Sequence, residues 1–338
     1  MIIDGYAHCW TPKYMDELRR SPNQKVKEAA QTMYEIWKEH PNQIDLDLRL
    51  HDLDKNKIDL QVGAVHEKND PNTFPLADNE RLRLCRLLND EAAQLMSISK
   101  NRIIPMGAAP LPSIEDGGLE EMRRAINDLG LKGFTVPTNV SGRPLDEFKS
   151  FWKEAARLDA VVYIHPNNPA NANSRSYEAD FDLMHTFGWP FETTLALSRL
   201  VFSGIMEECQ NLKIVSHHLG GMLPFFMGRV NETYEGKKKA PMKGDQQEKA
   251  RSKLSRPLLD YFKMFYYDTA VGGSVEAVRC GYGVFGADRL VFGTDYPWGP
   301  EEGRLRLATY PDMVKKACPS EEDQKKILGL NMKKLLKL

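Results

Sequence analysis

The sequence predicts an α/β protein, a single distorted (β/α)8 TIM barrel with a helical insertion after the first strand. Three observations support this prediction. The 338 residues are enough for such a barrel, which takes ~250 residues before insertions. Eight short β-rich runs alternate with helical patterns, and several of these runs are continuously apolar, as in parallel strands that are buried on both faces. Four runs end in polar residues, and the carboxyl ends of barrel strands are where such proteins assemble their chemistry.

Composition excludes several classes of protein. Hydrophobic residues make up 41% of the chain and charged residues 28%, which is too apolar for a disordered protein. A net charge of −1 gives no overall attraction to nucleic acid, and the apolar runs fall short of the ~20 residues of a membrane helix. The first residues show no basic flank or apolar signal core, and the five cysteines include no CxxC pair. We therefore expect a soluble, cytoplasmic protein with no nucleic-acid or membrane partner.

The expected elements alternate along the whole chain. The strands are Met1–Ala7, Leu60–His66, Arg102–Ala108, Leu131–Val136, Ala160–His165, Leu212–His217, Met264–Thr269 and Arg289–Thr294. The helices are Asn79–Ser99, Gly118–Leu129, Leu145–Leu158, Thr193–Glu208, Leu258–Phe262, Val275–Tyr282 and Glu321–Leu335. In the first helix, Leu82, Cys85 and Leu88 recur every third residue, which gives that helix an apolar face. Eight strands separated by helices predict one barrel over residues 1–338.

Residues 11–57 interrupt this alternation. They contain a helical pattern over Lys25–His40 between the first two strands, and the segment is too long for a simple βα loop. An insertion at the carboxyl end of the first strand is expected to lie over the barrel mouth.

Polar side chains at strand ends are the candidates for chemistry. His8 follows the first strand, His165 ends the fifth and Asp295 follows the eighth. Two imidazoles and a carboxylate are ligands that a zinc-like divalent ion prefers, with a position left for water or substrate. A single strand-end histidine is more often a hydrogen-bonded structural residue, but the joint pattern favours a metal site.

These residues belong to a wider pattern that resembles the amidohydrolase-2 branch of the metal-dependent amidohydrolase superfamily, which includes aminocarboxymuconate semialdehyde decarboxylase and γ-resorcylate decarboxylase. The matching pieces are Asp4–His8, Lys132–Phe134, Pro144–Asp146, Ile164–Pro166, Glu192–Thr194, Ser203-Gly204, His218–Pro224, Gly228-Arg229, Tyr267–Thr269 and Gly293–Pro297. The resemblance implies that His8, His165 and Asp295 are metal ligands and that His218 is the catalytic histidine. It also implies one divalent ion, zinc before manganese, and a homodimer.

One residue departs from the family pattern. The family has HxH or ExH on the first strand, whereas this chain has Tyr6-Ala7-His8, so a tyrosine stands at the first ligand position. A phenol with a pKa near 10 is a poor ligand unless the ion drives its deprotonation. Three interpretations stay open: a site held by His8, His165 and Asp295 with extra water, a site with Tyr6 as a fourth ligand, or a site without metal.

The same residues suit two reactions. In a decarboxylase, His218 or Asp295 protonates the carbon that carries the carboxylate, and CO2 leaves. In a hydrolase of a lactone or related ester, Asp295 takes the proton of a metal-bound water while His218 stabilises the oxyanion. We favour a metal-dependent decarboxylase of a small aromatic or unsaturated carboxylic acid. The hydrolase is the alternative, and a metal-free binding or scaffold barrel is the second alternative.

Four further residues are candidates for substrate binding. Arg175 lies in the loop after the fifth strand and offers a guanidinium to a carboxylate. Trp189, by resemblance, belongs to the segment that covers the substrate, and packing at a helix start explains it equally well. His66 ends the second strand and Trp298 follows the eighth, so each is placed to line the pocket or to serve the structure.

Overall fold

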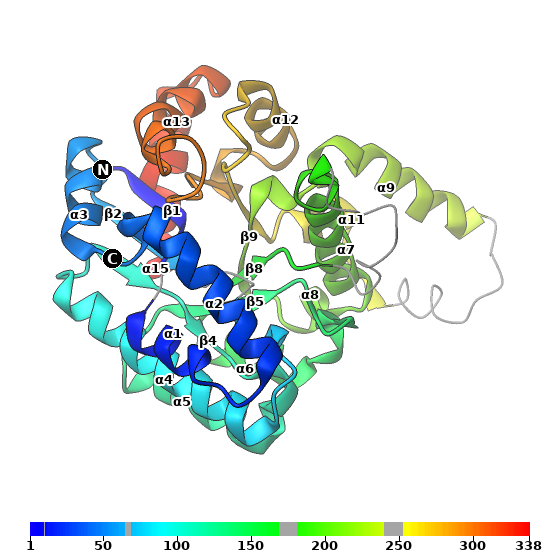
Figure 1. The fold of residues 1–338 in the computed structure, drawn as a ribbon. Coiled ribbons are helices and arrows are strands. Elements are labelled where there is room, and N and C mark those ends of the chain that lie inside the picture. Colours follow the sequence, from blue (N-terminus) through cyan, green and yellow to red (C-terminus); the bar gives the residue numbers. More distant parts are fainter. Residues whose placement is uncertain (10, 65–68, 169–180, 240–252) are drawn as a thin grey trace.

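The strands form two parallel sheets and a short hairpin. The computed structural model describes residues 1–9, 11–64, 69–168, 181–239 and 253–338 (Figure 1). One sheet has the order β1-β2-β3 and the other β11-β10-β9-β8-β5-β4, while β6 and β7 pair with each other. The strands are β1 Ile3–His8, β2 Leu60–Ala64, β3 Ile103–Pro105, β4 Gly107–Ala108, β5 Gly133–Pro137, β6 Asn139–Val140, β7 Arg143–Pro144, β8 Val161–His165, β9 Lys213–Ser216, β10 Tyr266–Asp268 and β11 Leu290–Val291.

The two parallel sheets meet at both of their edges. Only Met106 separates β3 from β4, and its backbone N–H still donates to Gly63 of β2, at 2.7 Å. On the other side, Gly5 of β1 donates to the carbonyl of Phe292, which follows β11, also at 2.7 Å. All strand pairs in these sheets are parallel, so their carboxyl ends lie at one common edge.

Helices surround the strands (Figure 1). They are α1 Pro12–Arg19, α2 Gln24–Glu39, α3 Leu46–Lys55, α4 Asp78–Ile98, α5 Leu119–Asn127, α6 Lys149–Arg157, α7 Trp189–Phe202, α8 Ile205–Glu208, α9 Leu223–Lys239, α11 Leu258–Phe262, α12 Val275–Phe285, α13 Arg304–Ala317, α14 Glu321–Lys325 and α15 Asn331–Leu336. Within the part of the chain that the structure describes, no helix combines the length and the apolar character needed to cross a membrane.

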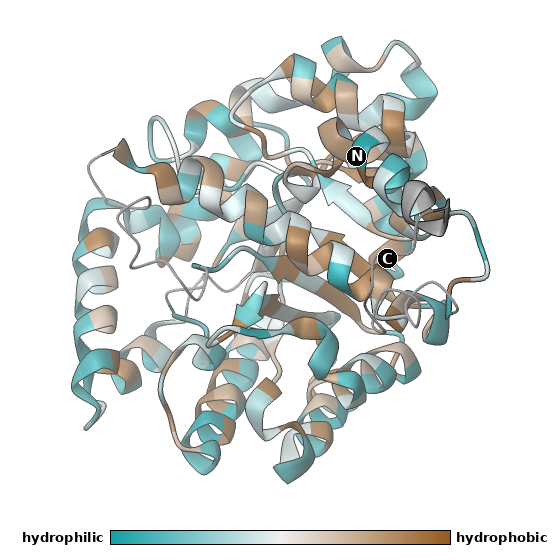
Figure 2. Ribbon diagram, turned by 90° about the vertical axis from the view of Figure 1, so that its right-hand side faces the viewer, coloured by the Kyte–Doolittle hydropathy of each residue, from teal (hydrophilic) through white to brown (hydrophobic). Residues whose placement is uncertain are grey.

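The strands are apolar on both faces, as the continuous apolar runs predicted. Val62, Tyr163 and Val215 pack in an inner core between the strands. Their sequence neighbours, among them Val162 and Ile214, belong to the outer core beneath the helices. Figure 2 shows brown, hydrophobic strands in the centre and helices whose ribbons alternate between brown and teal. Burial on both faces therefore accounts for the lack of polar alternation in these runs.

The segment 11–57 divides into two parts. Helices α1 and α2 form their own small core with α4, in which Met15, Met33 and Trp37 are buried against Leu84 and Leu88. Helix α3 instead packs on the strands, because its Leu53 belongs to the same core as Ala7 and Ile58. The expected helix Lys25–His40 corresponds to α2, whereas α3 serves as one of the helices around the sheets.

Each expected strand overlaps an observed one, but the hairpin β6–β7 and helices α1, α3, α9 and α13 were not predicted. The hairpin β6–β7 consists of two strands of two residues, too short for a periodic signal. Helix α13 contains Pro311, which normally indicates the end of a helix. Helix α9 was not expected either, and its last residues are charged.

Candidate functional site

The residues predicted at strand ends come together at the carboxyl edge of the sheets. Tyr6 and His8 lie on β1, His165 ends β8, and Asp295 follows β11. The ring centroids of His8 and His165 are 5.1 Å apart, and His8 Nε2 lies 3.2 Å from Asp295 Oδ1. His218, after β9, has its ring centroid 5.7 Å from that of Tyr6. Residues from four separate parts of the chain thus surround one place.

An irregularity in β1 directs Tyr6 and His8 toward this place. The pairing of β1 with β2 shifts between Asp4 and Ala7. Ile3 packs in the inner core and Ala7 in the outer core. Since neighbouring side chains of a strand point to opposite faces, Tyr6 and His8 face inward, on either side of Ala7. The side chains of both are almost completely buried.

The Tyr6 hydroxyl lies next to the predicted ligands. Its oxygen lies 3.0 Å from His8 Nε2, and Asp295 Oδ1 lies 3.2 Å from the same nitrogen. Two atoms that bind one ion with bonds of ~2.1 Å are separated by roughly 3.0–3.4 Å. The Tyr6 hydroxyl oxygen and Asp295 Oδ1 are therefore each at a distance from His8 Nε2 that neighbouring ligands can have.

His165 is oriented by its own backbone. Its Nδ1 lies 2.7 Å from the carbonyl oxygen of Pro166, which can only accept, so Nδ1 carries the proton and Nε2 holds the lone pair. This type of contact fixes the tautomer of metal-binding histidines. The separation of 5.1 Å between the rings of His8 and His165 matches the ~5 Å expected for two imidazoles on one ion.

Arg306 holds the second oxygen of Asp295. Its guanidinium donates to Asp295 Oδ2 at 2.7 Å and to the carbonyl of Thr294 at 3.3 Å. Burial alone would raise the pKa of Asp295, but the hydrogen bond and charge of His8, together with the charges of His218 and Arg306, hold that pKa well below its ordinary value. Asp295 is therefore an anion across the physiological pH range, which suits a ligand better than a proton donor.

The two adjacent histidines after β9 have different surroundings. His218 is partly exposed, whereas His217 is completely buried and its Nδ1 donates to Asp268 Oδ2 at 2.9 Å. Burial lowers the pKa of His217 well below its ordinary value, so this imidazole is neutral. Burial also raises the pKa of Asp268 to about 7. Of these two histidines, His218 is thus the one that is open to solvent, and its catalytic role stays a prediction.

Two of the four predicted substrate residues are near this place. The ring of Trp189, at the start of α7, lies 5.8 Å from that of His165, and Trp298 lies 6.3 Å from His8. Trp189 Nε1 also donates to Asn168 Oδ1 at 3.0 Å. His66 and Arg175 lie outside the described residues, so their roles stay predictions.

The residues present fit a divalent ion in donor type, with one donor that is a phenol. Imidazole nitrogen and carboxylate oxygen suit zinc, and oxygen donors suit manganese. Within the described ranges, no three His, Cys, Asp or Glu side chains are grouped closely enough to hold an ion as they stand. The third near donor is the hydroxyl of Tyr6, at the position where the family has an imidazole or a carboxylate.

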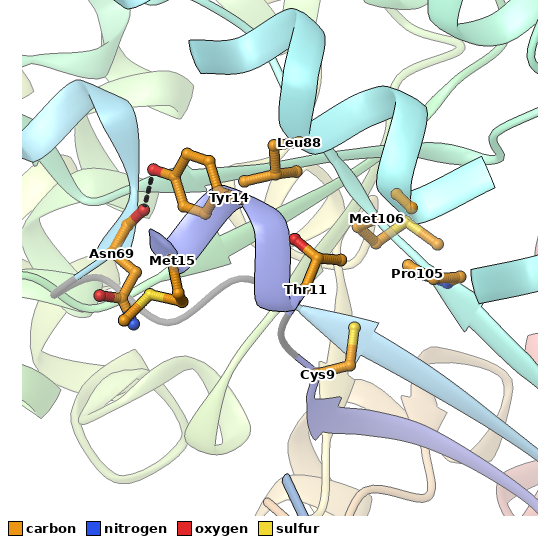
Figure 3. A pocket seen from close by; sticks show the side chains of 9 residues that line it. Cys9, Thr11, Tyr14, Met15, Asn69, Leu88, Pro105 and Met106 are labelled. Carbon is orange, nitrogen blue, oxygen red and sulfur yellow. Dashed lines mark hydrogen bonds between the residues drawn. The ribbon is translucent and has the colours of Figure 1, made fainter. Parts of the chain in front are cut away.

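A small cavity lies beside the site but does not belong to it. It has a volume of about 20 Å³ and is lined by side chains of α1, α4, β3 and the segments next to them, among them Cys9 and Met106. Figure 3 shows Cys9, Met15 and Leu88 around it, with the Tyr14 hydroxyl bonded to the carbonyl of Asn69. A space of this size holds about one water molecule. It is too small for a substrate.

Sequence reasoning missed Arg306 and the contacts of Asp268. Arg306 belongs to the unpredicted helix α13, and nothing in the sequence connects it with Asp295. Asp268 ends a predicted strand, so its position pointed to the site, but its partners His217 and His218 become visible only in the fold.

The chain is similar to known decarboxylases in sequence and in structure. The sequence model of the family described as Amidohydrolase matches residues 3–338. The chain is 29% identical to 2-amino-3-carboxymuconate-6-semialdehyde decarboxylase of Dictyostelium discoideum, over 87% of this chain and 77% of that protein. It is 28% identical to gamma-resorcylate decarboxylase of Rhizobium sp. (strain MTP-10005), over 90% and 91% of the two chains. A crystal structure of dihydroxybenzoic acid decarboxylase from Polaromonas sp. JS666, with bound manganese and the inhibitor 2-nitroresorcinol, has a TM-score of 0.78 and 25% identity, covering 100% of this chain and 97% of that one.

Proposed function

The chain belongs to the amidohydrolase family, and from this premise we propose that it is a metal-dependent decarboxylase of a small aromatic or unsaturated carboxylic acid. The observation that carries the proposal is the convergence of His8, His165, Asp295 and His218 at one edge of the strands. The curated relatives reported above are decarboxylases, and both are matched over most of their length.

The ion is a single divalent cation held by His8, His165 and Asp295, with Tyr6 beside it. When bound, such a cation polarises an oxygen of the substrate and stabilises negative charge there. Zinc suits two imidazoles and a carboxylate, whereas the similar structure from Polaromonas holds manganese. The assay below therefore uses both zinc and manganese.

His218 is the proton donor in this proposal. Decarboxylation breaks the bond between the ring or vinylic carbon and the carboxylate carbon, CO2 leaves, and a proton takes its place on the carbon. The partly exposed His218 can deliver that proton, because an imidazole can hold a proton and pass it on as a general acid. Asp295 stays ionised beside Arg306 and His8. In this proposal it therefore binds the ion and does not donate the proton.

The test is a turnover assay with product identification. Purified protein supplied with manganese or zinc is incubated with dihydroxybenzoates and with muconate-type acids, and the release of CO2 is measured. The proposal expects CO2 and the decarboxylated product from at least one acid, and no turnover after the metal is removed. Hydrolysis of a muconate-type lactone without any CO2 release would replace it with the hydrolase alternative. A protein that takes up neither ion would favour the scaffold alternative.

The architecture has a finer interpretation as well. We infer that the two sheets form one closed (β/α)8 barrel over residues 1–338, because hydrogen bonds connect β1 to the segment after β11 and Met106 connects β3 and β4 to β2. In this interpretation α1 and α2 lie at the mouth, where His40 at the end of α2 has its ring 5.9 Å from that of Trp298.

Assembly and location are also proposals. A homodimer is supported by exposed aromatic side chains at the starts of α7 and α9, among them Phe187, Phe191 and Phe225.

A cytoplasmic location is supported by five cysteines that are all free. Size measurement in solution tests the first, and cell fractionation tests the second.

A further inference from the structure

The backbone that carries His218 has an unfavourable conformation. His218 and Leu219 have φ angles of 52° and 58°, in the left-handed region that side chains with a Cβ rarely adopt. Each such residue has a steric cost, because its Cβ lies too close to the following carbonyl oxygen. Gly220 and Gly221 continue the turn at φ angles of 74° and 66° without that cost. A conformation of this kind persists only when its surroundings hold it in place.

Asp268 holds this turn from the neighbouring strand. Its Oδ1 accepts a hydrogen bond from the backbone N–H of His218 at 3.0 Å and another from Ala270 at 2.9 Å. Its Oδ2 accepts from His217 Nδ1 at 2.9 Å. Asp268 and His217 are both completely buried, so water does not compete for these bonds.

The same carboxylate reaches Tyr6 through His217. The imidazole of His217 stacks on the ring of Tyr6, with a centroid separation of 3.5 Å and an angle of 21° between the planes. Among the described residues, His217 Nε2 is buried and has no hydrogen-bond partner. The position of this ring therefore depends on the bond to Asp268 and on the stacking contact.

We propose that Asp268 is a positioning residue of the site, which directs His218 through its backbone N–H and places Tyr6 through the imidazole of His217. Asp268 ends β10, His217 and His218 follow β9, and Tyr6 lies on β1. One carboxylate thus connects three strands whose ends carry the chemistry. The effect on turnover rests on the proposed function, whereas the effect on the two imidazoles does not.

Two substitutions separate the two contacts. In Asp268→Asn, the amide oxygen still accepts from His218 and Ala270, but the amide NH2 now faces His217 Nδ1. His217 must then accept at Nδ1 and carry its proton on Nε2. In Asp268→Ala, both contacts are lost and the turn is no longer held. The matched control is Glu121→Gln, which alters an equally buried carboxylate that bonds Asn89 at 2.7 Å and Arg124 at 2.8 Å, far from the site on α5.

The experiment measures kcat and KM together with nitrogen-15 spectra of the histidine rings in the full-length protein. We expect Asp268→Asn to lower kcat roughly 10- to 100-fold, as loss of an orienting partner does at comparable sites, with KM nearly unchanged. The spectra should show the change of tautomer at His217. Glu121→Gln should lower thermal stability and leave kcat and both imidazole spectra unchanged.

Three results would overturn the inference. The first is an Asp268→Asn variant whose kcat equals that of the wild type. The second is a Glu121→Gln variant that loses as much kcat as Asp268→Asn does. The third is a set of His217 and His218 ring spectra that the Asp268 variants do not change. If the wild-type protein turns over no carboxylic acid, the proposed function fails, and the ring spectra still decide the role of Asp268. If Asp268→Ala does not fold, Asp268→Asn carries the test alone.

Discussion

Two carboxylates in this molecule make similar contacts in different places. Glu154, on α6, accepts hydrogen bonds from Arg157 at 2.6 Å and from Arg123 at 2.7 Å. Asp295, after β11, lies 2.7 Å from Arg306 and 3.2 Å from His8. Each carboxylate therefore meets two cationic or potentially cationic side chains.

The two carboxylates differ in what surrounds them. Glu154 lies in a regular helix, and the side chains of Arg123 and Arg157 are 46% and 57% exposed. Asp295 has a φ angle of 63°, and Arg306 and His8 are 19% and 1% exposed. Backbone strain of this kind is concentrated at functional sites, where the surroundings maintain it. The same type of contact therefore stabilises the helix layer at Glu154, whereas at Asp295 it fixes the direction of a carboxylate that we propose as a metal ligand.

The largest effect is expected at His218. His218→Asn should keep the fold and the bound metal but lower turnover by the ~10²–10⁴ that general acid–base catalysis supplies. Steady-state kinetics and metal content of the purified variant check this prediction. Loss of the metal in His218→Asn would instead place His218 among the ligands.

The next largest effect should come from the partner of Asp295. Arg306→Met releases Asp295 Oδ2, so affinity for manganese or zinc should fall roughly 10- to 100-fold, as for other groups that orient a ligand. Titration calorimetry with each ion measures it. The control is Arg123→Met, which removes the equivalent contact of Glu154 and should leave metal affinity unchanged. Equal affinities in the two variants would contradict the contrast between the two carboxylates.

Tyr6 should have a smaller effect on the ion. Tyr6→His supplies an imidazole at the family's first ligand position, so metal affinity should rise, by about tenfold or more. Tyr6→Phe should leave affinity nearly unchanged, because a phenol is a poor ligand at neutral pH. Metal stoichiometry against chelator concentration distinguishes the variants. Loss of the metal in Tyr6→Phe would show that the phenol is itself a ligand.

The smallest effect is expected at Glu154 and concerns stability alone. The hydrogen bond from Arg157, partly opposed by burial and assisted by Arg123, lowers the pKa of Glu154 to about 2 from an ordinary 4.5. Its stabilising effect is therefore present above pH 4.5 and is lost as the pH falls through about 2. Glu154→Gln should lower the free energy of unfolding by about 1 kcal/mol at pH 7, with kcat unchanged. Urea unfolding of the wild type and of Glu154→Gln measures the free energy of unfolding of each protein. The difference between the two values should be smaller at low pH than at pH 7. A difference that does not depend on pH would refute the assigned cause.

Much of the fold could be predicted because it depends on local pattern. The strands Val161–His165 and Lys213–Ser216 lie within the predicted runs, and α11 has the predicted bounds. The hairpin β6–β7 and helix α13 could not be predicted, since one is too short for periodicity and the other contains Pro311. Tertiary packing overrides propensity at Pro311, because Leu307 and Val314 on either side of it are buried in the core.

The sequence by itself determined which residue types stand at the strand ends. His8, His165 and Asp295 are there because the chain order places them after buried apolar runs, and parallel strands bring such ends to one edge. Only the tertiary structure decided how the groups are paired and aimed. Arg306 reaches Asp295 from eleven residues further along the chain, and Asp268 reaches His217 from another strand. Such contacts depend on where two packed elements meet. The number of residues between two side chains in the sequence does not give their distance in the fold.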